Sequence, residues 1–165
     1  MLATMSFTYA ENSHAENKSV YGLYEKVQFP EFKNVIIKAK LDTGAKTASL
    51  GATDIHFFER NGEQWVSFKP QIKGQDLPVM ERLLVRNSNI KRRIADLSEG
   101  EDVLHTARPV VLMNICFDGK LKAIEVNLTD RSHFIYPLLL GSSALVELDA
   151  IVDPSLTYQS LPNCK

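Results

Sequence analysis

Apolar and polar side chains alternate in two stretches of the chain. Residues 35–41 are apolar at 35, 37, 39 and 41, with lysines at 38 and 40. Ile124, Val126 and Leu128 alternate in the same way with Glu125 and Asn127. A period of two is the signature of a β-strand with one buried face. Both stretches are therefore predicted to be strands that pack against a common core.

Two dipeptides mark tight hairpin turns between such strands. Asn61-Gly62 separates residues 55–58 from 65–68, and Asp118-Gly119 separates Val110–Phe117 from Leu121–Leu128. Both dipeptides accept the positive φ angles of a type I′ turn. The best helical candidate is short, Ser142–Leu148. The pattern predicts an all-β protein, a closed or partly closed barrel of short antiparallel strands with one short C-terminal helix.

The length and charge of the chain limit the range of functions it can have. The chain has 165 residues, 44% of them hydrophobic and 24% charged, and a formal charge of −1. This is the composition of one globular domain, with no overall electrostatic reason to bind nucleic acid and no apolar run long enough to span a membrane. We expect a flexible leader or signal remnant over 1–19, one barrel domain over 20–158 and a tail over 159–165. A two-lobed enzyme with one catalytic group in each lobe does not fit this length.

The N-terminus and the cysteines bear on the cellular compartment. Met1–Ala10 is apolar and uncharged and is followed by a polar stretch, which suits either the end of a secretory signal or a disordered leader. We favour export. Cys116 and Cys164 are interpreted as a buried thiol and an incidental one, and the sequence does not decide whether they form a disulfide.

One polar segment interrupts the strand pattern. Residues 86–107 carry many charged side chains without clean alternation. They suit a solvated hairpin or long loop, or a mobile cover over a site, in which Ser88, Arg92 and Asp96 would be flap residues. The basic run at 91–93 is too short to indicate a nucleic-acid partner.

The strongest chemical motif is Asp42-Thr43-Gly44, at the end of the alternating stretch 35–41. Such a motif presents an acid at a strand end: glycine permits close backbone approach, and threonine can hydrogen-bond inward. Many such tripeptides are plain turns. The apolar segment Leu138–Leu140, Gly141 and the short helix come later in the chain. A strand ending in Asp-Thr-Gly, paired with such a segment, is the arrangement of one half of a retroviral-type aspartic peptidase.

With these motifs in place, the chain resembles a family of bacterial retropepsin-like proteins that are often called ATP-dependent zinc proteases. Some of them are encoded beside an ATP-grasp glutamate ligase. The matching segments are Lys38–Leu50, Arg108–Val111, Leu128–Ser132 and Leu138–Leu145.

The resemblance implies a retropepsin-like barrel that acts on peptides or proteins as a homodimer. Asp42 of each copy would supply one of the two carboxylates that aspartic proteolysis needs. Thr43, Gly44 and Ala45 would support this loop, with Thr43 bracing the two loops across the dimer. Leu139, Leu140 and Gly141 would form the cleft wall, and residues 86–107 would be the flap.

The sequence departs from the family at one position. Ser142 replaces an arginine that, in retropepsins, supports the dimer and the active-site loop. Asp130 and Arg131 could form a compensating ion pair. Asp153 is interpreted as a strand-end turn residue rather than a second catalytic acid. The alternative to a peptidase is an inactive retropepsin-fold module that binds peptides or regulates a partner.

The sequence offers no motif for a cofactor. It has no His-Glu-x-x-His, no phosphate-binding glycine loop and no serine or cysteine nucleophile motif. Its four histidines are isolated: His14, His56, His105 and His133. We therefore predict neither a metal nor another cofactor.

Overall fold

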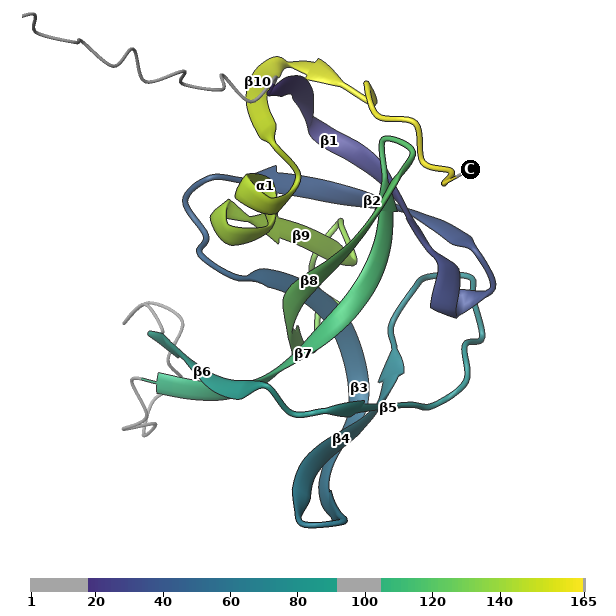
Figure 1. Ribbon diagram of the computed structural model, residues 1–165, viewed down its shortest axis with the longest axis vertical. Helices are drawn as coiled ribbons and strands as arrows, with labels where there is room; N and C mark the ends of the chain where they lie inside the picture. The colour runs from purple at the N-terminus through teal and green to yellow at the C-terminus, as the bar shows by residue number, and fades with distance from the viewer. Residues whose placement is uncertain (1–17, 92–104, 165) are drawn as a thin grey trace, which may run out of the picture.

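The computed structural model describes residues 18–91 and 105–164, which form a β-barrel with one short helix (Figure 1). The strands are β1 (Ser19–Phe29), β2 (Val35–Asp42), β3 (Ala48–Arg60), β4 (Glu63–Pro70), β5 (Met80–Leu83), β6 (Arg86–Lys91), β7 (His105–Phe117), β8 (Lys120–Thr129), β9 (Leu138–Gly141) and β10 (Ala150–Thr157). A 3-10 turn, η1 (Pro30–Phe32), follows β1, and α1 (Ser142–Glu147) lies between β9 and β10. The predicted all-β class and the short helix are confirmed.

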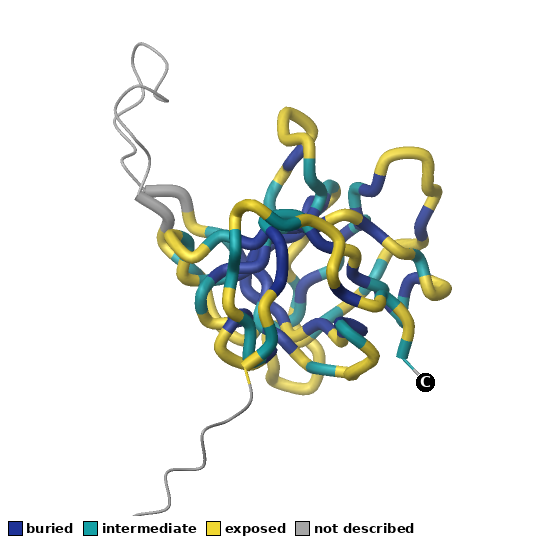
Figure 2. The backbone as a smooth tube through the Cα atoms, turned by 90° about the horizontal axis from the view of Figure 1, so that it is seen from above, coloured by how far each residue is buried: buried dark blue, intermediate teal, exposed yellow. Residues whose placement is uncertain are grey.

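Six strands close the barrel. They pair in the order β1-β2-β9-β3-β8-β7, and a contact between Gln28 of β1 and Cys116 of β7 closes the ring. β10 extends this sheet beside β1, and β6 extends it beside β7. The outer half of β3 pairs with β4, which pairs with β5. Buried residues follow the inner segments of the chain, and the ends of the projecting hairpins are exposed (Figure 2).

The alternation in the sequence corresponds to the two faces of the barrel wall. Ile37, Ala39 and Leu41 of β2 are at most 4% exposed and belong to the core. Ile124, Val126 and Leu128 of β8 are buried in the same way. The largest fully buried side chains include Phe29, Phe32, Phe68 and Phe117. Burial of this apolar surface is the main force that holds the barrel together.

Both predicted hairpin turns are confirmed. Asn61 and Gly62 have φ angles of 56° and 79° between β3 and β4. Asp118 and Gly119 have φ angles of 49° and 73° between β7 and β8. Positive φ at both central positions is what a type I′ turn requires.

The C-terminal segment is anchored to the barrel. Glu25 of β1 is fully buried, and its carboxylate accepts hydrogen bonds from the backbone N–H groups of Gly22, Gln159 and Ser160 and from the Ser160 hydroxyl, at 2.6–3.0 Å. A disulfide joins Cys116 to Cys164. The interpretation of these cysteines as unpaired thiols is therefore wrong. Residues 159–164 are tied to the fold at two points.

The disulfide is expected to stabilise the fold chiefly by restricting the unfolded chain. It links residues 48 positions apart, and closing a loop of that length is worth about 2–4 kcal/mol. Replacing Cys164 by alanine should lower the free energy of unfolding by about that amount. Urea unfolding of the oxidised chain, the reduced chain and Cys164→Ala measures this. The variant should match the reduced wild type and should not respond to reductant, whereas equal stability in all three samples would contradict the expectation.

Candidate active site

Asp42 is the last residue of β2 and lies on its outer face, opposite the buried Leu41. The backbone N–H of Gly44 donates to Asp42 Oδ1 at 3.0 Å, and the N–H of Ala45 donates to the Asp42 carbonyl at 3.3 Å. Lys40 Nζ lies 3.8 Å from Asp42 Oδ2. The Asp42 side chain is 32% exposed. The loop thus fixes the carboxylate while leaving it partly exposed to solvent.

The strand β9 and the start of α1 hold the other side of this loop. β9 runs parallel to β2, with Asp42 in register with Gly141. The backbone N–H groups of Ser142 and Ser143 donate to the carbonyls of Ala45 and Lys46 at 2.7 and 3.0 Å. The Asp-Thr-Gly loop and the junction of β9 with α1, which the sequence analysis expected to lie together, are therefore side by side and joined by backbone hydrogen bonds.

Gly141 permits this close contact. A Cβ atom at this position would lie 2.8 Å from the Lys46 carbonyl oxygen and 2.8 Å from the carbonyl carbon of Thr47. These are backbone atoms, so the loop would have to move. Gly44 differs, because a Cβ there would meet only Asp42 Oδ1, at 3.4 Å.

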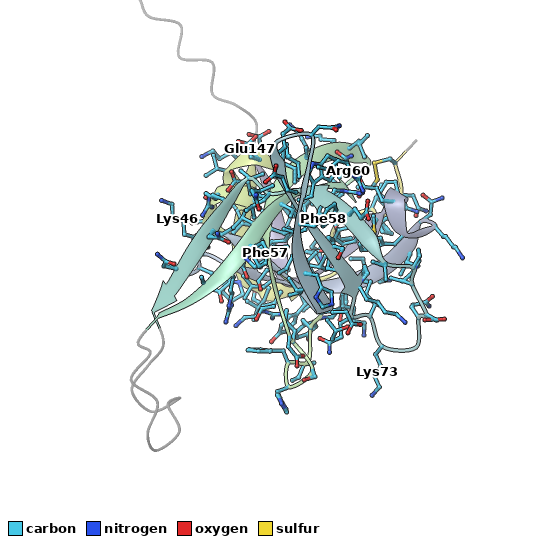
Figure 3. All side chains as sticks on the ribbon, turned by 90° about the horizontal axis from the view of Figure 1, so that it is seen from below. Lys46, Phe57, Phe58, Arg60, Lys73 and Glu147 are labelled. Carbon is cyan, nitrogen blue, oxygen red and sulfur yellow. A yellow bond between two sulfur atoms is a disulfide. The ribbon has the colours of Figure 1, made fainter. Side chains whose placement is uncertain are left out.

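A cavity of about 1120 Å³ begins beside the loop. Its lining includes Ala45, Lys46 and Thr47 after the aspartate, Ser88 of β6 and Leu139 of β9. Its basic side chains are Lys46, Arg86, Arg108 and Arg131, and its acidic ones are Glu125 and Glu147. Lys46 projects at the edge of the molecule (Figure 3). Arg86 donates to Glu125 Oε2 from Nε and Nη2, at 3.1 and 2.6 Å.

The structure brings together most of the predicted site residues. Thr43, Gly44 and Ala45 form the loop, and Ser88 and Leu139 line the adjoining cavity. Leu140 requires a correction: it has no exposed surface, because alternate residues of β9 point into the core, so it cannot form a cleft wall. Arg92 and Asp96, predicted as flap residues, lie outside the described residues. Arg86–Lys91 and the first residues of β7 pair as a hairpin.

Two further expectations about acidic residues are wrong. Asp130 and Arg131 form no ion pair: Asp130 Oδ1 accepts a hydrogen bond from the Ser132 N–H, which lowers the pKa of Asp130, and Arg131 Nε donates to the Tyr136 carbonyl. Asp153 is not at a strand end but within β10. The Ser155 hydroxyl and N–H donate to Asp153 Oδ1 and lower the pKa of Asp153.

Sequence reasoning did not identify two buried polar residues that line the cavity. Ser49 and Asn127 are only 4% and 3% exposed, and the Ser49 hydroxyl donates to Asn127 Oδ1 at 3.0 Å. Asn127 follows the alternation as a polar residue and was expected to face solvent. The burial of Asn127 on the outer face of the barrel wall gives no distinctive local signal, because its partner Ser49 is 78 positions away. Arg108 and Arg131 were matched to the family only as sequence segments.

Other kinds of site find no support in the described residues. Within 18–91 and 105–164, no three His, Cys, Asp or Glu side chains are grouped so as to hold a metal ion. No helix in that part of the chain is long and apolar enough to cross a membrane.

The closed barrel, the Asp-Thr-Gly loop and the adjoining Gly141-helix junction define the retropepsin-like class of fold. The comparison with known proteins leads to the same class. The profile of the family described as "Retropepsin-like aspartic endopeptidase RimB" matches residues 20–162, and the chain belongs to this family.

Other proteins that the chain is similar to are named probable alpha-L-glutamate ligases. The chain is 35% identical over 141 residues to a probable alpha-L-glutamate ligase of Desulfotalea psychrophila, covering 84% of this chain and 29% of the relative. It is 33% identical over 144 residues to one of Shewanella pealeana, covering 87% and 30%. The chain thus spans less than a third of these relatives. A crystal structure of a Legionella pneumophila protein of unknown function is 38% identical, with a TM-score of 0.70, covering 86% of this chain and 97% of that one.

The backbone link at Gly141 leads to a stability prediction. Gly141→Ala should cost about 1–3 kcal/mol of folding free energy, because the new methyl group collides with the backbone of residues 45–47. Gly44→Ala is the matched control and should change stability little, since its methyl group has room. Thermal and urea unfolding measure both. Equal stability of the two variants would show that the contact at Gly141 does not constrain the loop.

Proposed function

We propose that the chain is an aspartic endopeptidase that acts as a homodimer, with Asp42 of each copy in one shared site. The observation that carries the proposal is the carboxylate at the end of β2, which is about one-third exposed, accepts a hydrogen bond from the Gly44 N–H and lies beside the Gly141 junction. The polar partners of Asp42 in the described part of the chain are Lys40 and Gly44, and they include no second carboxylate. A second copy would supply it.

The chemistry requires two carboxylates that share one proton. The ionised carboxylate takes a proton from water as the water oxygen attacks the peptide carbonyl carbon, and the protonated one gives its proton to the carbonyl oxygen. The tetrahedral intermediate then collapses: the C–N bond breaks, and the leaving nitrogen takes the proton that the first carboxylate received from water. The second carboxylate takes back a proton from a hydroxyl of the intermediate, so that the new carboxyl group forms and the shared proton is restored. No metal or redox cofactor enters these steps.

A surface beside the loop suits the second copy. Val20 and Ile151 are neighbours across β1 and β10, and each is 48% exposed. Val146 of α1 is 74% exposed and borders a hollow that Thr43 and Ser142 also line. An exposed apolar patch next to a half-complete site is typical of an interface between copies. We call Val20, Val146 and Ile151 the apolar patch.

A second candidate is an inactive peptide-binding or regulatory module. Ser142 favours it, because the family arginine that supports the dimer is absent at this position. In that case the chain would bind peptides in the cavity as a monomer, and Asp42 would be dispensable. The disulfide supports the preference for export under either candidate, because such bonds persist mainly in oxidising compartments.

Loss of the Asp42 carboxylate is the direct test of the peptidase. Asp42→Asn should abolish cleavage of a complex peptide library between pH 4 and 7 while unfolding at nearly the wild-type temperature, because it removes the shared proton site but few contacts. Asp153→Asn is the control and should cleave like the wild type, because Asp153 is bonded to Ser155 within β10. Mass spectrometry identifies the cleavage sites. A folded wild type that cuts nothing would favour the binding module.

The apolar patch gives a prediction about assembly. Val146→Asp should convert the dimer to monomers and remove activity, because it places a charge in the buried interface. Val79→Asp is the control, since Val79 is 61% exposed and lines a hollow with Lys33 and Lys69 instead. Sedimentation velocity gives the mass, and specific activity is followed on dilution. A Val146→Asp protein that remains dimeric and active would exclude this surface.

A further inference from the structure

The loop between β8 and β9 carries two large apolar side chains that project into solvent. Phe134 is 59% exposed and Ile135 is 89% exposed. Both line a hollow of about 800 Å³ together with Ile36 of β2, which is 46% exposed. A contiguous apolar patch on a protein surface marks a site of contact with a partner or a membrane. We call Phe134 and Ile135 the apolar tip.

The loop that carries the apolar tip is held in shape by its own contacts. Asp130 Oδ1 accepts a hydrogen bond from the Ser132 N–H at 2.8 Å. The Phe134 N–H donates to the Arg131 carbonyl at 2.9 Å. Arg131 Nε donates to the Tyr136 carbonyl at 3.1 Å, and Arg131 Cζ lies 4.4 Å from the centre of the Phe134 ring. The exposure of the tip is therefore built into the fold.

Lysine side chains lie in the hollow beside the apolar tip. Lys38 of β2, Lys69 of β4 and Lys73 line the same hollow as the tip. Among the described residues of that lining, Asp54 is the one acid, and Lys69 is paired with Asp76 at 2.9 Å. Lys73 projects from the edge of the molecule (Figure 3). The whole chain has a formal charge of −1, so the excess of positive charge is local to this surface.

This combination of side chains suits the surface of an anionic bilayer. Apolar side chains on a rigid loop can enter the boundary between headgroups and acyl chains, where lysines beside them attract anionic headgroups. The long apolar stems of the lysines let their ammonium groups stay at the headgroups while the tip goes deeper. A groove that binds a peptide keeps its apolar residues along recessed walls, whereas Ile135 is almost fully exposed.

We propose that the apolar tip and the lysines beside it attach the chain to the surface of an anionic lipid bilayer. The chain lies on the bilayer without crossing it. The loop leads directly into β9, which ends at Gly141 in register with Asp42, so attachment holds the candidate active site close to the membrane surface. The attachment does not depend on peptidase activity and applies equally to a binding module.

Co-sedimentation of the full chain with lipid vesicles tests the proposal. The vesicles contain phosphatidylcholine alone, or phosphatidylcholine with about 30% phosphatidylglycerol as the anionic lipid. The protein should partition at least about tenfold more strongly to the anionic vesicles. Binding should weaken when salt is raised from about 0.1 M to about 0.5 M, because salt screens the lysines. Absence of binding to the anionic vesicles would overturn the proposal and favour a protein partner for this surface.

Substitutions at the tip separate its contribution from general adhesion. Phe134→Ser combined with Ile135→Ser should lower partitioning to the anionic vesicles roughly tenfold or more, because it removes the apolar side chains that enter the bilayer. Leu121→Ser combined with Leu161→Ser is the matched control. These leucines are 59% and 67% exposed near the turn between β7 and β8, at the other end of β8 from the tip, and the control should bind like the wild type.

The lysines are tested in the same way. Lys38→Gln combined with Lys73→Gln should weaken binding to the anionic vesicles by roughly fivefold for each lysine. Lys120→Gln combined with Lys122→Gln removes the same charge at the start of β8 and should bind like the wild type. Circular dichroism and thermal unfolding report whether each variant is folded. Undiminished binding by the tip variant, or an equal loss in a variant and its control, would contradict attachment through this surface.

Discussion

The backbone contact between the Asp42 loop and the junction of β9 with α1 is the constraint on which the site depends. Ser142 and Ser143 donate to the carbonyls of Ala45 and Lys46, and they can do so only because Gly141 has no side chain. This contact joins three things: the strand that ends in Asp42, the short helix that carries part of the apolar patch, and the cavity that begins at residue 45. A shift of this junction would move all three together. The position of the carboxylate is therefore set by the barrel and not by the loop alone.

Buried polar groups in this fold divide into two kinds. The carboxylate of Glu25 is fully buried and accepts four hydrogen bonds from Gly22, Gln159 and Ser160, so it is satisfied within the chain. Such a group stabilises a tertiary arrangement, here the attachment of the C-terminal segment. Arg131 is nearly as buried, but its charge has no counter-ion in the described residues. The first kind is satisfied by contacts within the fold, whereas the second lies beside the cavity without a counter-ion among residues 18–91 and 105–164.

The sequence predicted what depends on local patterns. The alternation in residues 35–41, the turns at Asn61-Gly62 and Asp118-Gly119 and the helix near residue 142 are all encoded within a few positions, and the structure confirms them. The pairing of Asp42 with Gly141 came from a family pattern. What could not be predicted depends on contacts between distant positions: the disulfide, the tethering of residues 159–164 and the buried Ser49–Asn127 pair. Leu140 was misplaced because the motif identifies the strand but not which of its faces is buried.

The replacement of the family arginine by Ser142 has a limited effect within one copy. In this chain the loop is held through backbone N–H groups, which any residue except proline provides, so Asp42 keeps its place without the guanidinium group. In the proposed homodimer, the loss would fall instead on contacts between copies, where an arginine would supply charged hydrogen bonds. The hollow next to Thr43 is lined there by Lys18, Ser142, Leu145, Val146, Asp149 and Ala150. Association would therefore rest on apolar burial beside a few charged groups. Such an interface depends on protein concentration, so the amount of dimer, rather than the geometry of the loop, would limit activity.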